Sequence, residues 1–158
     1  MAKLLRLPEA VPDPAVDPDL PLIPLAEWVK DPTRHTPGGT GLGVRVAPAD
    51  KVEELAPHLS GIAVIAIEFP NPGDGRGFTS ARLLRQRYGF KGEIRAVGAG
   101  VKQDLLFFMA RCGIDAFELV PTENEAEARQ ALNRFTLAYQ PAVPRGDVRE
   151  ARFTAARR

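Results

Sequence analysis

Apolar and polar residues alternate between residues 42 and 140 in an order that predicts strands and helices in turn. Four short apolar runs, at residues 42–47, 62–69, 93–97 and 116–120, predict strands. The run at 62–69 is nearly continuous, which is typical of a strand buried on both faces of a parallel sheet. Each run is followed by a segment with apolar residues at helical spacing. Such strand–helix units connect by right-handed crossovers and build a parallel sheet.

The predicted fold class is α/β, with four βα units whose mainly parallel sheet is open and covered by helices. A half-barrel of the same four units is the alternative, and its uncovered edge would favour a homodimer. We expect residues 42–140 to form this domain. The proline- and glycine-rich residues 1–41 predict an N-terminal extension packed on the body, extended and irregular over residues 1–24. The arginine-rich residues 141–158 predict a tail that is disordered or docked on a partner.

Polar residues suggest where the helices begin. Asp50 with Glu53, and Thr122 with Glu125, have the spacing of a capping box. A helix over about residues 80–88 is expected to be capped by Thr79 or Ser80, with Arg82, Arg85 and Gln86 mostly outward. In the extension, the segment LAEWVK fits one or two helical turns, and residues 33–43, with four glycines, predict a mobile surface loop.

Composition excludes several classes of function. The formal charge is +1, from 21 basic and 20 acidic residues, so there is no overall attraction for nucleic acid or an anionic membrane. No apolar run reaches the length of a membrane span, and the N-terminus does not have the pattern of a signal peptide, so we expect a cytoplasmic protein. The single cysteine, Cys112, excludes an internal disulfide, and the spacing of His35 and His58 fits no metal site. No dinucleotide or Walker fingerprint occurs, and we predict neither a cofactor nor a metal.

Polar residues gather where the second and third predicted strands end, which is where open parallel sheets bind ligands. There, a free helix N-terminus and an arginine fork would favour a small oxyanion, with Asp74 holding Arg76 and Arg95 converging on it. A tight turn with a local ion pair explains Asp74 and Arg76 equally well. The anion-binding candidates are Asp74, Gly75, Arg76, Ser80, Arg95 and Gly98.

Three further acidic residues are secondary candidates. Glu68 ends the strongest strand and is the first polar side chain near the predicted site. Glu93 alternates with Arg95 on one strand face, which favours a structural partnership of Glu93 with an arginine. Asp104 suits a cap or the first turn of its helix. Cys112, on an apolar helix face, is interpreted as a buried small hydrophobe rather than a reactive thiol.

The central motif resembles the bacterial domain-of-unknown-function 934 family, and the resemblance covers most of residues 21–143. The family pattern has a Phe-Pro strand end, an Asp-Gly-Arg loop, a Leu-Arg helix, a Gly-Glu-Leu-Arg-Ala strand, an Arg-Cys-Gly helix end and an Asp-Ala-Phe-Glu strand. Matching residues include Phe69, Pro70, Asp74, Gly75, Arg76, Ser80, Ala81, Leu84, Arg85, Gly92, Glu93, Arg95, Ala96, Gly98, Asp104, Arg111, Cys112, Gly113, Phe117 and Glu118. After the Ala-Val-Gly turn the family usually has an acidic residue, where this chain has Ala99-Gly100.

The resemblance implies a role in sulfur assimilation, because members' genes commonly lie beside those of the assimilatory sulfite reductase. It implies no catalytic residue. The first hypothesis is an accessory protein of sulfite reduction that binds the reductase, or another sulfur-assimilation enzyme, and holds a small oxyanion. The second is a small sulfur-metabolism enzyme in which Asp74 or Glu68 acts as acid or base and the arginines stabilise an oxyanion. The sequence leaves open whether the protein is an enzyme.

Overall fold

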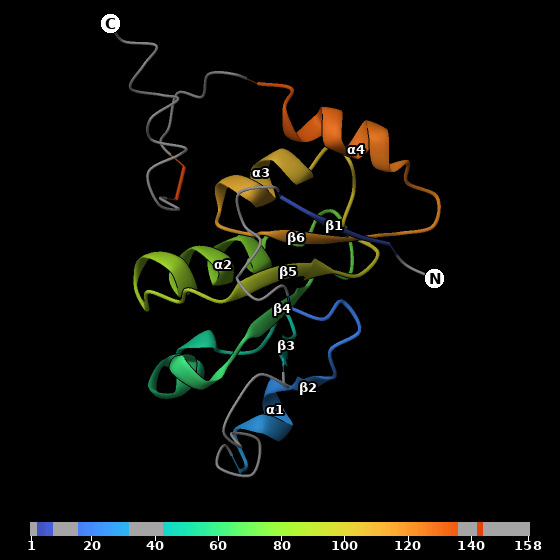
Figure 1. The fold of residues 1–158 in the computed structure, drawn as a ribbon. Coiled ribbons are helices and arrows are strands. Elements are labelled where there is room, and N and C mark those ends of the chain that lie inside the picture. The colour runs from blue at the N-terminus through green and yellow to red at the C-terminus, as the bar shows by residue number, and fades with distance from the viewer. Residues whose placement is uncertain (1–2, 8–15, 32–42, 136–141, 144–158) are drawn as a thin grey trace, which may run out of the picture.

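A computed structural model describes residues 3–7, 16–31, 43–135 and 142–143. It is a mixed α/β fold with one open, mostly parallel sheet of six strands in the order β1-β6-β5-β4-β3-β2 (Figure 1). The strands are β1 (Lys3–Arg6), β2 (Leu22–Pro24), β3 (Gly43–Val46), β4 (Val64–Glu68), β5 (Glu93–Val97) and β6 (Ala116–Leu119). The helices are α1 (Leu25–Trp28), the 3-10 helix η2 (Val52–Gly61), α2 (Arg76–Gln86), α3 (Leu106–Arg111) and α4 (Glu125–Leu132).

The four strands predicted from the apolar runs are present as β3 to β6. They are parallel neighbours in chain order, each joined to the next by a helical crossover. Two further strands come from the predicted extension, so residues 1–24 are not irregular throughout. Strand β2 joins parallel to β3, and β1 pairs antiparallel with β6. Two stretches of residues 1–41, β1 and β2, therefore belong to the sheet.

Several predicted helix boundaries are wrong. Helix α2 begins at Arg76, so Ser80 lies inside the helix and caps nothing. The cap of α4 is Asn124, whose side chain accepts a hydrogen bond from the Ala126 amide at 2.8 Å. The carboxylate of Asp50 accepts from the Ala47 amide and does not cap η2. Side chains of this kind can satisfy a nearby turn as readily as a helix end, so spacing alone does not decide between them.

One face of the sheet holds the main hydrophobic core. Ile65 and Ile67 of β4, Ile94 of β5 and Phe117 of β6 are buried there against apolar residues of η2 and the helices α2, α3 and α4. Alternation along a strand sends the intervening residues to the opposite face, called here the second face. This division follows from the crossovers, because right-handed connections between sequential parallel strands put their helices on one side.

A buried ion pair joins α2 to the amino ends of β5 and β6. The guanidinium of Arg85 pairs with Asp115 and donates to the carbonyl oxygens of Phe90, Gly92 and Gly113. The side chain of Arg85 is only 9% exposed, so the prediction that it points outward is wrong. Asp115 in turn accepts from the Ile94 amide at 2.8 Å. These bonds fix the start of two strands, and Arg85 is therefore structural.

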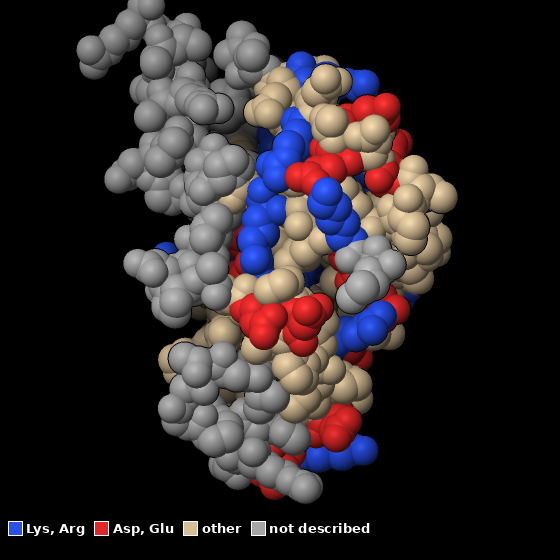
Figure 2. Space-filling view, turned by 45° about the vertical axis from the view of Figure 1, so that its right-hand side comes forward, with Lys and Arg blue, Asp and Glu red and all other residues tan. Residues whose placement is uncertain are grey.

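Some predictions fall outside the described residues, including the loop at 33–42 with His35 and the tail beyond residue 143. Within the described ranges, no helix is both long and apolar enough to cross a membrane. Among those same residues, no group of three or more histidine, cysteine or acidic side chains could hold a metal ion. The face shown in Figure 2 carries basic and acidic side chains close to one another, without a broad area of one sign.

Candidate functional site

Three arginines lie in one row across the second face of the sheet. The register aligns Arg45 with Ala66, Ala66 with Arg95, Arg95 with Ala116, and Ala116 with Arg6. Neighbouring strands are separated by about 4.8 Å, so each alanine leaves room for the guanidinium groups on either side of it. We call Arg6, Arg45 and Arg95 the arginine row. The sequence motif contained only Arg95 of this set.

Glu93 holds two members of the arginine row. One carboxylate oxygen accepts from Nε of Arg95, and the other accepts from Nε of Arg6 at 2.8 Å. The Glu93 side chain is fully buried and that of Arg95 is 3% exposed. A carboxylate without partners would be costly at this depth, so Glu93 is an internal counter-ion. The predicted partnership of Glu93 with an arginine is thereby confirmed.

Main-chain carbonyls of residues 16–18 complete the surroundings of the arginine row. The Nη1 and Nη2 groups of Arg95 donate to the oxygens of Pro18 and Asp17, both at 2.8 Å, and Arg6 donates to the oxygen of Val16. All three nitrogens of the Arg95 guanidinium are thus engaged inside the protein. The segment that supplies the oxygens to Arg95 lies more than 70 positions from Arg95 in sequence, and no local pattern identifies it.

Arg45 forms a more open pair with Glu68 at the carboxyl end of β4. The Nη2 group of Arg45 lies 3.1 Å from Oε1 of Glu68, and the two side chains are 45% and 30% exposed. Glu68 is therefore at the predicted strand end and accessible to solvent. Its arginine partner comes from a neighbouring strand.

The loop after β4 carries the Asp-Gly-Arg motif and bonds to itself. The carboxylate of Asp74 accepts from Nε and Nη2 of Arg76 at 2.9 and 2.6 Å, and from the Arg76 amide at 3.2 Å. These bonds lower the pKa of Asp74 and raise the pKa of Arg76. Asp74 thus accepts from the first amide of α2, where the sequence analysis placed a bound anion. The side chain of Arg76 remains 62% exposed.

The remaining loop candidate, Gly98, has a structural role. Its φ of +104° is a conformation that favours glycine, and a Cβ there would lie 2.7 Å from the carbonyl oxygen of Phe69. The Gly100 amide donates to that same oxygen at 2.7 Å. Ala99, between these two glycines, is exposed. The loops after β4 and β5 are therefore locked together through their backbones.

Asp104 and Cys112 lie on either side of α3. Asp104 is exposed in the turn before Leu105, the N-cap of α3, so it is neither the cap nor part of the helix. Cys112 directly follows the helix and is half-buried against the core. Burial raises the pKa of its thiol, and the charges of Arg82 and Arg111 oppose that shift. A raised thiol pKa lowers the thiolate fraction and hence the reactivity.

The charged candidates form three separate groups: the arginine row with Glu68 and Glu93, the self-paired Asp74–Arg76 loop, and Asp104. Arg95 shares no bonding partner with Arg76, because Glu93 and the main chain hold Arg95 whereas Asp74 holds Arg76. The Arg76 side chain pairs with Asp74 at the protein surface, whereas the Arg95 side chain pairs with Glu93 in the interior. Interior polar groups saturated in this way hold a sheet together and position side chains, and they offer few donors to a ligand.

The fold and these groups define a small α/β protein with a mostly parallel open sheet and an internally neutralised charged face. Residues 43–148 match the sequence model of a family described as "Bacterial protein of unknown function (DUF934)". The match covers more than half of the chain, and the protein belongs to this family. This match confirms the family that the central sequence motif predicts. None of the curated proteins compared with the chain matches it.

Proposed function

We propose that the protein is a cytoplasmic, non-catalytic accessory protein of assimilatory sulfite reduction. It binds the sulfite reductase or another sulfur-assimilation enzyme. The gene context implied by the family resemblance supports the pathway. The accessory role rests on one observation, that arginines already hold the acidic candidates Asp74 and Glu93. Arg76 lowers the pKa of Asp74, so the Asp74 carboxylate is a weak general base and is already ionised near neutral pH.

The Asp74–Arg76 loop is the proposed contact with the partner enzyme. Arg76 presents an exposed guanidinium whose orientation is fixed by the bonds to Asp74. Arginine is over-represented among the residues that dominate binding energy at interfaces, and a side chain held in advance loses less entropy on binding. We leave the oxyanion between Arg76 and Arg95 out of the proposal, because the Arg95 nitrogens are engaged by Glu93, Asp17 and Pro18.

A small sulfur-metabolism enzyme is the second candidate function. The observation in its favour is the half-exposed Glu68–Arg45 pair at the carboxyl end of β4, where α/β enzymes place reacting groups. In that case Glu68 is the general acid or base, and Arg45 stabilises an oxyanion of the substrate. Glu68→Gln would then abolish growth on sulfate while leaving the binding of the partner enzyme intact.

The test of the accessory role is affinity purification of the tagged full-length protein from its native host growing on sulfate. Wild type is compared with Arg76→Ala and with Arg129→Ala. Arg129 is a matched control because it is an exposed arginine paired with an acidic residue, Glu125, on another helix. We expect a sulfur-assimilation enzyme to co-purify with wild type and Arg129→Ala but to be lost with Arg76→Ala.

Two results would contradict the proposal. If no sulfur-assimilation enzyme co-purified with the wild-type protein, the proposed binding of such a partner would be wrong. Equal recovery with wild type and Arg76→Ala would place the contact elsewhere. The thermal midpoint of Arg76→Ala should stay close to that of wild type because the Arg76 side chain is 62% exposed and its pair with Asp74 is screened by solvent. A large drop would show that the loop is structural, and the loss of partner would then have another cause.

A further inference from the structure

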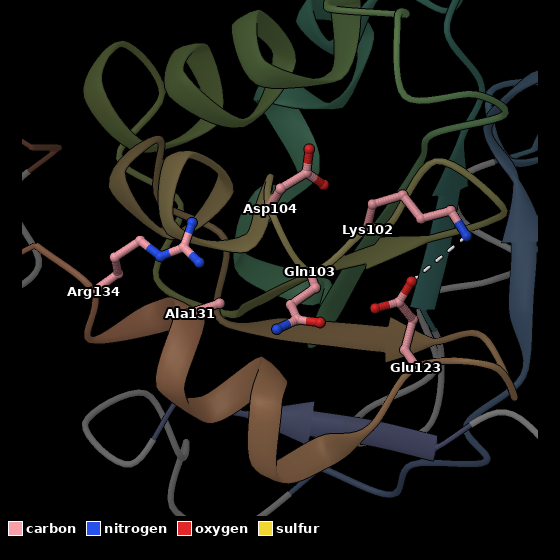
Figure 3. A pocket seen from close by; sticks show the side chains of 6 residues that line it. All are labelled: Lys102, Gln103, Asp104, Glu123, Ala131 and Arg134. Atoms are coloured by element: carbon pink, nitrogen blue, oxygen red, sulfur yellow. Dashed lines mark ion pairs between the residues drawn. The ribbon is translucent and has the colours of Figure 1, made fainter.

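A polar hollow lies between the loop that leads into α3 and helix α4, apart from the arginine row and the Asp74–Arg76 loop; Asp104 is part of its lining. Its volume is about 400 Å³, within the range of small-ligand pockets. The lining residues are Lys102, Gln103, Asp104, Glu123, Ala131 and Arg134 (Figure 3). Its first four lining residues follow the carboxyl ends of the adjacent strands β5 and β6. Parallel α/β sheets bind their ligands at this edge.

The lining contains two acidic and two basic side chains, of which Lys102 and Glu123 form a loose ion pair (Figure 3). Nζ of Lys102 lies 3.6 Å from Oε1 of Glu123, which is longer than a hydrogen bond. The Glu123 side chain is only 15% exposed. Among the described residues, the carboxylate of Glu123 accepts no hydrogen bond, and neither Asp104 nor Arg134 forms an ion pair. A half-buried carboxylate in this state is ready to accept a donor from outside the chain.

The positions of the side chains suit a ligand that carries both signs of charge. Figure 3 shows Gln103 directed into the space between Glu123 and the guanidinium of Arg134. A lone anion or a lone cation would meet both the basic side chains, Lys102 and Arg134, and the carboxylates of Asp104 and Glu123, so either would be repelled by half of the charges. The lining as a whole has no net charge, so a neutral ligand with separated charges pairs with both signs without a net repulsion.

We propose that this hollow binds a small zwitterion of the amino-acid class. The carboxylate of the ligand pairs with Arg134 in a planar, two-bond contact. Its ammonium group donates to Glu123. The Gln103 amide, which can donate and accept, bonds to the ligand between these ends. This site is independent of the proposed docking loop, since it shares no residue with it.

The test is a titration of the full-length protein with amino acids, followed by saturation-transfer NMR and calorimetry. Pools of the natural α-amino acids are screened first. Glycine, β-alanine and γ-aminobutyrate then vary the separation of the two charges, and propylamine and propionate each carry only one. We expect at least one zwitterion to bind at millimolar concentration or below, and the single-charge compounds to bind at least about tenfold more weakly.

Variants assign any binding to the hollow. Arg134→Gln and Glu123→Gln should each weaken binding of the selected zwitterion about tenfold or more. Arg129→Gln should bind as wild type, because Arg129 is on α4 two residues before Ala131 and hence on the other side of the helix. Circular dichroism confirms that each variant is folded. Absence of binding by every zwitterion, or equal binding by wild type and both hollow variants, would overturn the proposal.

Discussion

The arginines of this protein divide into those fixed inside the fold and those offered to solvent. The side chain of Arg95 is 3% exposed and that of Arg76 is 62% exposed, although both residues belong to the same family motif. Alternation along a strand was enough to predict that Glu93 and Arg95 share a face and pair. It could not predict Arg6 or the carbonyls of residues 16–18, because these partners are brought in by tertiary structure alone.

The buried counter-ion Glu93 should be essential for stability. Glu93→Gln keeps the shape but leaves the charges of Arg6 and Arg95 without their carboxylate. Breaking a buried pair in this way costs about 3–5 kcal/mol, so we expect a loss of that order in the free energy of unfolding, measured by urea denaturation at neutral pH. Glu127→Gln, at an exposed position in the first turn of α4, is the control and should lower the midpoint only slightly, by the loss of one favourable charge at the helix start. A small loss for Glu93→Gln would mean that the arginine row does not depend on this charge.

The Asp74–Arg76 pair predicts a pH effect of known sign. Hydrogen bonds from Arg76 lower the pKa of Asp74 below its ordinary value. Because the folded-state pKa is below that of the unfolded chain, the pair stabilises the fold above the ordinary carboxyl range. That contribution is lost as the pH falls through the lowered pKa. An NMR titration of the Asp74 carboxyl carbon should show this pKa, and Arg76→Ala should return it to the ordinary value. An unchanged titration in the variant would show that the pair does not persist in solution.

At the scale of whole elements, the apolar runs of residues 42–120 predict strands β3 to β6, whereas the two strands of the proline-rich N-terminal segment were not predicted. Strand β1 has four residues, as many as β3 and β6, so its length is not the reason. The prolines near β1 and β2 favoured irregular backbone, and β2 has only three residues. The start of α2 was missed because Gly75 and Gly77 flank Arg76, and glycine-rich sequence is typical of loops. The structure shows why one of these glycines lies inside the helix.

Gly77 is required by close packing between α2 and the end of β4. A Cβ at Gly77 would lie 2.5 Å from Cζ of Phe69, a buried ring packed at a centroid distance of 5.4 Å against Phe78. Alanine ordinarily favours a helix over glycine by about 1 kcal/mol. Here we expect the opposite sign, with Gly77→Ala destabilising by about 1–3 kcal/mol through overpacking. Gly75→Ala is the matched control, since no atom lies within 4 Å of its Cβ. Thermal unfolding of both variants tests this, and a Gly77→Ala variant as stable as wild type would contradict it.

At the scale of the whole molecule, the N-terminal segment adds strands to both edges of the sheet that the parallel strand–helix units form. Strand β1 covers the outer edge of β6, and its Arg6 reaches Glu93 on β5 across the second face. Residues 16–18 then bond to Arg6 and Arg95 before the chain enters β2 at the opposite edge of the sheet. One segment therefore links both edges of the sheet and its charged face, which explains why the sequence-based division at residue 41 separates parts that fold together.

If β1 protects the edge of β6, its removal should change how the chain associates. Deletion of residues 1–7 leaves the outer backbone groups of β6 unpaired, and an unpaired edge is a template for another chain. We expect the deletion variant to be less stable and to self-associate more strongly than wild type, measured by urea denaturation and by sedimentation velocity over a range of concentrations. Arg6→Met separates the two effects, because it removes the bond to Glu93 but retains β1. It should lose stability without increased self-association. Identical sedimentation of the deletion variant and wild type would show that β1 contributes contacts to the fold but does not prevent association through the edge of β6.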